Sequence, residues 1–133
     1  MGVYPTAPYP GNNHCIQPNA WAERYYLDYG PLLSAIRGKK WVLVPHVVRA
    51  SGVAKSNLFE VPGGYAMPVT FAGKATTIEV TLKRLPGMSE KMACEAIHPG
   101  SDKAATIRPK VSDFDIRLEV PIVRGCAMVQ LRL

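Results

Sequence analysis

The sequence lacks a long hydrophobic run, and this absence argues against a membrane-spanning helix. No stretch of 18 or more apolar residues occurs in the 133-residue chain, whereas a helix needs about 20 such residues to cross a bilayer. The sequence also lacks a charged start followed by an apolar stretch, so no secretory signal is predicted. We therefore expect no membrane partner, and the sequence leaves the localisation open.

Cysteine is scarce, which argues against a disulfide framework or a zinc site. Cys15, Cys94 and Cys126 are the three cysteines of the chain; they cannot all pair with one another, and they lack the short paired spacings of zinc ligands. We expect buried thiols, no metal and no cofactor. At 14.5 kDa the chain is long enough to form one domain around one hydrophobic core.

Concentrated basic charge is also missing, although the formal net charge is +6. The lysines and arginines are scattered, and Lys39–Lys40 is the only adjacent basic pair before Lys83–Arg84. Aromatic residues do not interleave with them as in a face that binds single-stranded nucleic acid. Nucleic-acid binding is therefore not expected, and the charge favours general solubility.

What the sequence does contain is clean strand patterning between Asn57 and Lys83. Successive side chains of a strand point to opposite faces, so apolar residues at every second position share one face. A Pro-Gly-Gly turn at 62–64 precedes this pattern, and the short link 72–74 predicts a hairpin. We therefore expect three adjacent antiparallel strands. Their shared apolar positions are Tyr65, Met67, Val69 and Phe71 in one strand and Ile78, Val80 and Leu82 in the next.

Further strands are predicted on both sides of this region. The segment 41–48 is β-branched and aromatic but is interrupted at Pro45, which lacks the amide that a central strand position needs. The remaining candidates are 92–97, a brief piece at 106–108, 114–120 and 126–133. About seven strands without intervening helices predict a mainly β fold, an antiparallel β-sandwich.

The N-terminal region differs from the rest in composition. Residues 1–18 are rich in proline and lack periodicity, so they predict an extended arm. Asn19 is a good N-cap, and one helical face follows. Pro31 removes a hydrogen bond to Leu27, which predicts two short helices or a kink. The domain organisation is thus an arm at 1–18 and, at 19–133, a helix pair followed by the sandwich. The helical face consists of Trp21, Tyr25, Tyr29, Leu32 and Ile36.

No catalytic residues are predicted. Asp113 and Asp115 would project from one strand face about 6.5–7 Å apart, a separation that glycosidase carboxylates use. However, they alternate with core residues and share their face with Arg117 and Glu119, which is typical of a solvated surface. The three histidines, His14, His46 and His98, do not form a nucleophile elbow or a metal-binding helix with the cysteines.

A polar cluster in the arm is the candidate for contact with a sugar. Asn12, Asn13 and His14 follow Gly11 and lie close in sequence to two tyrosines. These side chains could hydrogen-bond a sugar while the tyrosines stack on it. Gly-Asn-Asn is also ordinary turn chemistry, and both readings remain open.

Several phrases resemble a known family. The runs "RYYLDYGPLLSAIRGKKWVLVPHVV", "AKSNLFEVPGGYAMPVTFAGKA" and "VPIVRGCAMVQLRL" resemble the C-terminal end of large glycoside hydrolases, where a β-sandwich follows a (β/α) barrel. The leading "YPTAPYPGNNHCIQP" is similar to the last barrel segment. The resemblance implies a sandwich packed on a catalytic barrel, with the catalytic carboxylates on barrel strands that this chain does not contain. It also places Asn12, Asn13 and His14 in a barrel-end motif near the sugar.

We therefore expect a non-catalytic accessory domain or fragment that packs on a catalytic barrel or contacts carbohydrate. The face carrying Trp21 and Tyr25, which such a barrel would bury, should otherwise leave an apolar patch and allow homo-oligomers to form. Two alternatives remain. One is an independent carbohydrate-binding module, and the other is a self-assembling structural β-sandwich protein with an extended arm.

Overall fold

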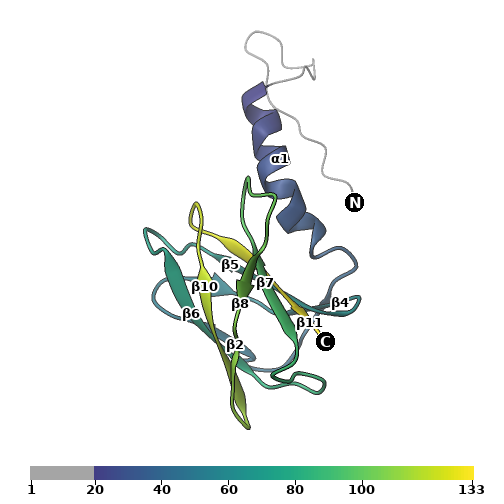
Figure 1. Cartoon of the computed structure of the whole chain (residues 1–133). Helices are drawn as coiled ribbons and strands as arrows, with labels where there is room; N and C mark the ends of the chain where they lie inside the picture. Colours follow the sequence, from purple (N-terminus) through teal and green to yellow (C-terminus); the bar gives the residue numbers. More distant parts are fainter. Residues whose placement is uncertain (1–19) are drawn as a thin grey trace.

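The computed structural model describes residues 20–133, and their side chains from residue 23. It shows a mainly β chain with two antiparallel sheets and one helix (Figure 1), which confirms the predicted sandwich-like fold. The predicted arm at 1–18 lies outside the described residues. The elements are α1 Ala20–Ser34, β1 Lys40–Trp41, β2 Val48–Ala50, β3 Lys55–Ser56, β4 Phe59–Val61, β5 Gly64–Thr70, β6 Thr77–Lys83, β7 Ala93–Ile97, β8 Ala105–Ile107, β9 Lys110–Val111, β10 Asp115–Pro121 and β11 Ala127–Arg132.

The strands form one larger and one smaller sheet. The order is β1-β4-β5-β11-β7-β8 in the seven-stranded sheet, where β3 also pairs with β5, and β2-β6-β10-β9 in the four-stranded sheet. The strands outnumber the predicted set because six of the eleven are only two or three residues long. Most of these short strands lie where the chain passes from one sheet to the other, whereas β4 lies between β3 and β5 of the same sheet.

The predicted hairpin between β5 and β6 is wrong. β5 pairs with β4, β3 and β11, whereas β6 pairs with β10 and β2, so the link 71–76 crosses between the sheets. Phe71 does not share the buried face of β5: its φ is 57° and its side chain is 76% exposed. Each strand has one fully apolar face, and placing the strands in opposing sheets lets these faces cover each other.

The predicted strand 41–48 is wrong over most of its length, because only its end residues lie in strands and residues 42–47 belong to none; the break expected at Pro45 coincides with a turn. β1 joins the larger sheet through β4, and β2 joins the smaller sheet through β6. Pro45 and His46 form a turn between them, and His46 has a positive φ of 53°. The residue that cannot continue a central strand is therefore located where the chain changes sheets.

The main core lies between the two sheets, on the faces that alternation predicted. In the smaller sheet it contains the inward residues of β6 and β10, and in the larger sheet those of β5, β7 and β11. All of the residues that follow are at most 5% exposed. The largest contributions come from Ile78, Val80, Leu82, Ile116, Leu118, Val120, Met67, Val69, Cys94, Val129 and Leu131.

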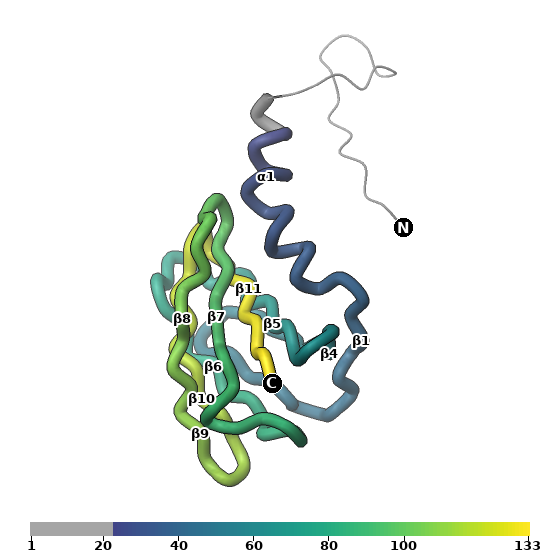
Figure 2. The backbone as a smooth tube through the Cα atoms, turned by 45° about the vertical axis from the view of Figure 1, so that its right-hand side comes forward, coloured from purple at the N-terminus to yellow at the C-terminus, as the bar shows by residue number. Residues whose placement is uncertain are grey.

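Helix α1 packs on the outer face of the larger sheet and forms a second, smaller core. Leu32 is 6% exposed and packs with Ala66 of β5 and Met128 of β11. These two residues point away from the main core because side chains alternate along a strand. The upper part of α1 projects beyond the sheets (Figures 1 and 2).

The predicted helix pair is instead a single helix that contains Pro31. Pro31 lacks the amide that would donate to the carbonyl of Leu27, and its ring crowds that carbonyl, yet the helix runs through it. The next turn continues, since the Ala35 amide donates to the Pro31 carbonyl at 3.2 Å. Burial of Leu32 directly after the proline stabilises this last turn against the sheet.

Candidate functional site

The residues predicted to approach a sugar cannot be placed. Asn12, Asn13 and His14 all lie outside the described residues, as does Cys15. The candidate site in residues 20–133 must therefore be sought among other side chains.

The two aspartates do not form a catalytic pair. Asp113 lies in a bend and only Asp115 belongs to β10, so they do not project from one strand face as predicted. Ser112 ties the turn together, because its amide donates to the Asp115 carbonyl at 2.8 Å and its hydroxyl accepts from the Asp115 amide at 3.1 Å. This is a tight structural turn with an exposed Phe114 at its tip, 82% accessible.

The histidines and cysteines of the described region are also dispersed. His98 is buried, and its Nε2 donates to the carbonyl of Pro121 at 2.9 Å, since a carbonyl can only accept. Burial raises the pKa of the Cys94 thiol to about 11, and it also raises the pKa of Cys126. A raised pKa keeps a thiol protonated and unreactive. Within residues 20–133 no group of three or more possible metal ligands occurs.

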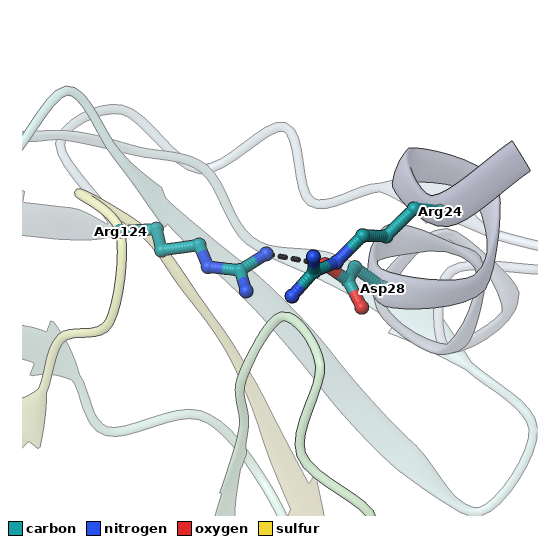
Figure 3. Close-up of polar contacts among 3 residues, drawn as sticks. All are labelled: Arg24, Asp28 and Arg124. Carbon is teal, nitrogen blue, oxygen red and sulfur yellow. Dashed lines mark hydrogen bonds and ion pairs between the residues drawn. The ribbon is translucent and has the colours of Figure 1, made fainter. Parts of the chain in front are cut away.

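Helix α1 is attached to the sandwich through Asp28. The Asp28 side chain is 15% exposed, and its carboxylate accepts a hydrogen bond from Nη1 of Arg124 in the turn between β10 and β11 (Figure 3). Arg24 lies on the preceding turn of the helix, with its Nε 4.0 Å from Oδ2 of Asp28. The backbone takes part as well, since the Gly100 amide donates to the Asp28 carbonyl at 3.1 Å. The carboxylate raises the pKa of the Arg124 guanidinium, so this pair stays ionised wherever the carboxylate is charged.

Gly100 is needed for this contact. Its φ is +68°, and a Cβ built there would lie 3.0 Å from Oδ1 of Asp28. The loop between β7 and β8 can therefore approach the helix closely only with glycine at this position. The β7–β8 loop and the β10–β11 turn both contact helix α1 at Asp28, and these contacts set the direction in which α1 projects.

The projecting helix exposes large apolar side chains, which we name the outer face of α1. It consists of Tyr26, Leu27 and Leu33, whose side chains are 45%, 72% and 65% exposed. At 100° per residue, Tyr26 and Leu33 lie on one side of the helix, and Leu27 lies opposite the buried Leu32. Tyr25, predicted to belong to an apolar patch, is 55% exposed, and its ring stacks on Tyr29 with centroids 6.3 Å apart.

The outer face of α1 was not predicted from the sequence, because the prediction rested on one helical stripe, that of Tyr25, Tyr29 and Leu32. A signal was present, however. The opposite side of an exposed helix normally carries charges, whereas α1 has only three charged residues, Glu23, Arg24 and Asp28. Asp28 is already engaged with Arg124, so little charge remains to solvate the helix.

No helix within residues 20–133 has the length and apolar character needed to cross a membrane. The outer face of α1 is the main candidate for contact with another molecule, because its large apolar side chains are exposed. Comparison of the chain with family models, with curated proteins and with solved structures finds no match in any of the three.

Proposed function

We propose that this chain is a non-catalytic accessory sandwich that docks through helix α1 on a separate folded domain. The resemblance to glycoside hydrolases suggests that this domain is a catalytic (β/α) barrel. The observation that carries the proposal is the outer face of α1, where three large apolar side chains are exposed on a helix attached to the sandwich through Asp28 and Leu32.

The distribution of apolar residues around α1 supports a second covering surface. Leu32 is buried on the sheet, Leu27 lies on the opposite side, and Tyr26 and Leu33 lie between them. A helix that is apolar on most sides is normally buried in a larger body. The sheet covers only one side, so the remaining sides are available to a partner.

The attachment of α1 supports docking by a preformed surface. The Asp28–Arg124 pair and the Gly100–Asp28 hydrogen bond hold the middle of the helix, and Leu32 holds its end. A surface held in its bound conformation loses little conformational entropy on association. The accessory domain would therefore stabilise its partner by binding it through a preformed surface.

Assembly through strand pairing, the route open to a self-assembling structural protein, is less favoured by the sheet edges. The smaller sheet ends in β2 and β9, which are three and two residues long, and the larger sheet ends in β1 and β8, which are two and three residues long. The links 51–54 and 108–109 carry the chain directly into the other sheet. Such short, interrupted edges offer little for another strand to pair with.

The gene sequence can test whether this chain is part of a larger glycoside hydrolase. A reading frame for a (β/α) barrel that runs without interruption into the codon for Met1 would support the accessory role. An in-frame stop codon directly upstream, with no barrel gene beside it, would count against it.

The docking surface can be tested on the proteins. The isolated barrel should bind the chain in calorimetry, and the double variant Leu27→Glu/Leu33→Glu should bind at least tenfold more weakly, because it buries charge in the interface. Phe114→Glu is the matched control, since Phe114 is also a large apolar residue that is mostly exposed, but it lies in the turn before β10. Equal loss of binding in both variants would reject α1 as the docking element.

The absence of catalysis has its own test. The chain alone should not hydrolyse aryl glycosides. Reproducible hydrolysis that is abolished by Asp113→Asn or Asp115→Asn would contradict the proposal.

A further inference from the structure

Pro68 of β5 lies opposite a break between β3 and β4 in the larger sheet, and a pocket lies beside this break. β3 and β4 both pair with β5 in one register, shown by Ser56 opposite Val69 and Phe59 opposite Ala66. Continuing this register places Asn57 opposite Pro68. Proline has no amide hydrogen to contribute to the ladder, and the strand is interrupted at Asn57 and Leu58.

The interruption frees this part of the chain for other contacts. The Leu58 carbonyl accepts a hydrogen bond from the amide of Val42 at 3.2 Å, and this joins the segment 56–58 to the segment 41–48. Between the two segments lies a pocket of about 280 Å³. It is lined by Trp41, Val42, Val44, His46, Val47, Val48, Ser56, Asn57 and Leu58.

Two hydrogen bonds and one ring contact hold the pocket walls in place. Lys83 of β6 donates from Nζ to the Pro45 carbonyl at 2.8 Å and from its amide to the Val47 carbonyl at 2.8 Å. The ring of Trp41 meets the ring of Phe59 edge to face, with centroids 4.6 Å apart. The pocket is therefore largely preformed, which is typical of sites for small ligands.

The lining has a specific chemical character. It contains no Asp, Glu, Lys or Arg, so it offers no counter-charge to an ionic ligand. It does include Trp41, which is 58% exposed, together with His46 and Asn57, which carry an imidazole and an amide. The Ser56 hydroxyl oxygen is buried and has no hydrogen-bond partner among the described residues, so it does not face the open part of the pocket.

His46 lies in the turn at one wall of the pocket. Its φ of 53° lies in the left-handed region, a conformation that histidine adopts more often than most residues with a side chain. This turn places His46 in the pocket lining together with Val44 and Val47.

The geometry points to a binding site for one neutral sugar ring in this pocket. A pyranose has an apolar face of C–H groups that stacks on an aromatic ring and a rim of hydroxyls that bond to amide and imidazole groups. The pocket volume of about 280 Å³ lies just below the range of about 300–1,000 Å³ for small-molecule sites, which suits one ring and not a long chain. No residue of α1 lines the pocket, so this site is independent of the proposed docking on a barrel.

The test is a titration of the whole chain with neutral methyl glycosides of glucose, galactose, mannose and xylose. Amide and indole signals in ¹H–¹⁵N spectra should shift for Trp41, Asn57 and their neighbours with at least one glycoside at millimolar concentration. Asn57→Ala and Trp41→Ala should each weaken that binding at least tenfold. His46→Gly should also weaken it, because the variant removes the imidazole and keeps the backbone conformation accessible.

Phe71→Ala is the matched control for Trp41→Ala, since Phe71 is an exposed aromatic residue outside the pocket and its removal should leave binding unchanged. Far-ultraviolet circular dichroism establishes that each variant is folded; if Trp41→Ala is not, Asn57→Ala and His46→Gly decide. Absence of localised shifts with every glycoside would overturn the proposal. So would binding that survives in the folded variants, or shifts produced by adenosine and not by any glycoside.

Discussion

Gly64 is the residue at which a single added methyl group should do most harm. It is the first residue of β5, with φ +152°, and a Cβ built there would lie 2.0 Å from the carbonyl oxygen of Leu131 on β11. Because this contact is with backbone inside a ladder, it cannot be relieved by a side-chain rotation. We expect Gly64→Ala to lower the free energy of unfolding by about 3 kcal/mol or more, measured by urea denaturation.

The neighbouring Gly63 provides a matched control. Its φ is +82°, but a Cβ there would meet nothing within 4 Å. Gly63→Ala should therefore cost only the conformational penalty, roughly 1–2 kcal/mol. Equal costs for the two variants would show that the close approach to Leu131 is not what selects glycine at residue 64.

Cys94 should make stability depend on alkaline pH. Burial raises the pKa of its thiol to about 11 from an ordinary 9.0, so between these values the unfolded chain loses a proton that the folded chain retains. The contribution is complete below pH 9 and is lost as the pH rises towards 11, amounting to roughly 2–3 kcal/mol.

The variant Cys94→Ala isolates this effect from the titration of other groups. Its stability deficit relative to the unsubstituted chain should shrink when urea denaturation is repeated at increasing pH from 8 to 10.5. A deficit that stays constant over that range would mean that the Cys94 thiol ionises equally easily in both states.

At the scale of elements, the two sides of helix α1 should behave differently on truncation. Leu32 is 6% exposed and packs on β5 and β11, whereas Leu33 is 65% exposed. We expect Leu32→Ala to cost about 2–4 kcal/mol because it leaves a cavity, and Leu33→Ala to change stability by no more than about 0.5 kcal/mol.

Hydrogen exchange provides the measurement for this pair. Amides of α1 should exchange faster in Leu32→Ala, while those of β6 and β10 should change less, because the helix is attached to the larger sheet. If Leu33→Ala accelerated exchange in α1 as strongly, Leu33 would have to be packed on the sandwich.

At the same scale, the interior strands were the most predictable elements. Alternation correctly identified the buried faces of β6 and β10, because Ile78, Val80 and Leu82 face Ile116, Leu118 and Val120 across one ladder. Alternation could not tell which strand pairs with which. The link 71–76 looked like a hairpin, yet it joins two sheets, since local spacing carries no information about the partner of each strand.

At the scale of the whole molecule, the outer face of α1 should cause self-association in the absence of a partner. Sedimentation velocity at increasing protein concentration should show species larger than the monomer. Leu27→Glu/Leu33→Glu should remain monomeric over the same range, because like charges on the exposed helix repel and are costly to bury.

Phe114→Glu again serves as the control and should associate as the unsubstituted chain does. A monodisperse monomer at high concentration for the unsubstituted chain would contradict this prediction. In that case the tyrosines and leucines of α1 would be adequately solvated as they stand.

The candidate sites were less predictable than the fold. The charge-poor composition of α1 was visible in the sequence, but its meaning required knowing that the sheet covers only the side of Leu32. The pocket beside Trp41 depends on Ser56 and Asn57, which the chain reaches only after crossing to the smaller sheet at β2 and returning. The aspartates, close in sequence, were separated by a turn that begins at Ser112.

The alternation of residues was enough to predict that this chain is mainly β and which side chains of its long strands are buried, because a period of two is a local property of the backbone. The turn at Pro45 was predictable as well, since a missing amide acts at the residue that lacks it. Three features emerge only in the folded chain: β5 and β6 lie in different sheets, α1 stays one helix through Pro31, and Trp41, His46 and Asn57 share a pocket. These outcomes depend on contacts between distant segments, whose free energy is set by what packs against each surface and not by the order of neighbouring residues.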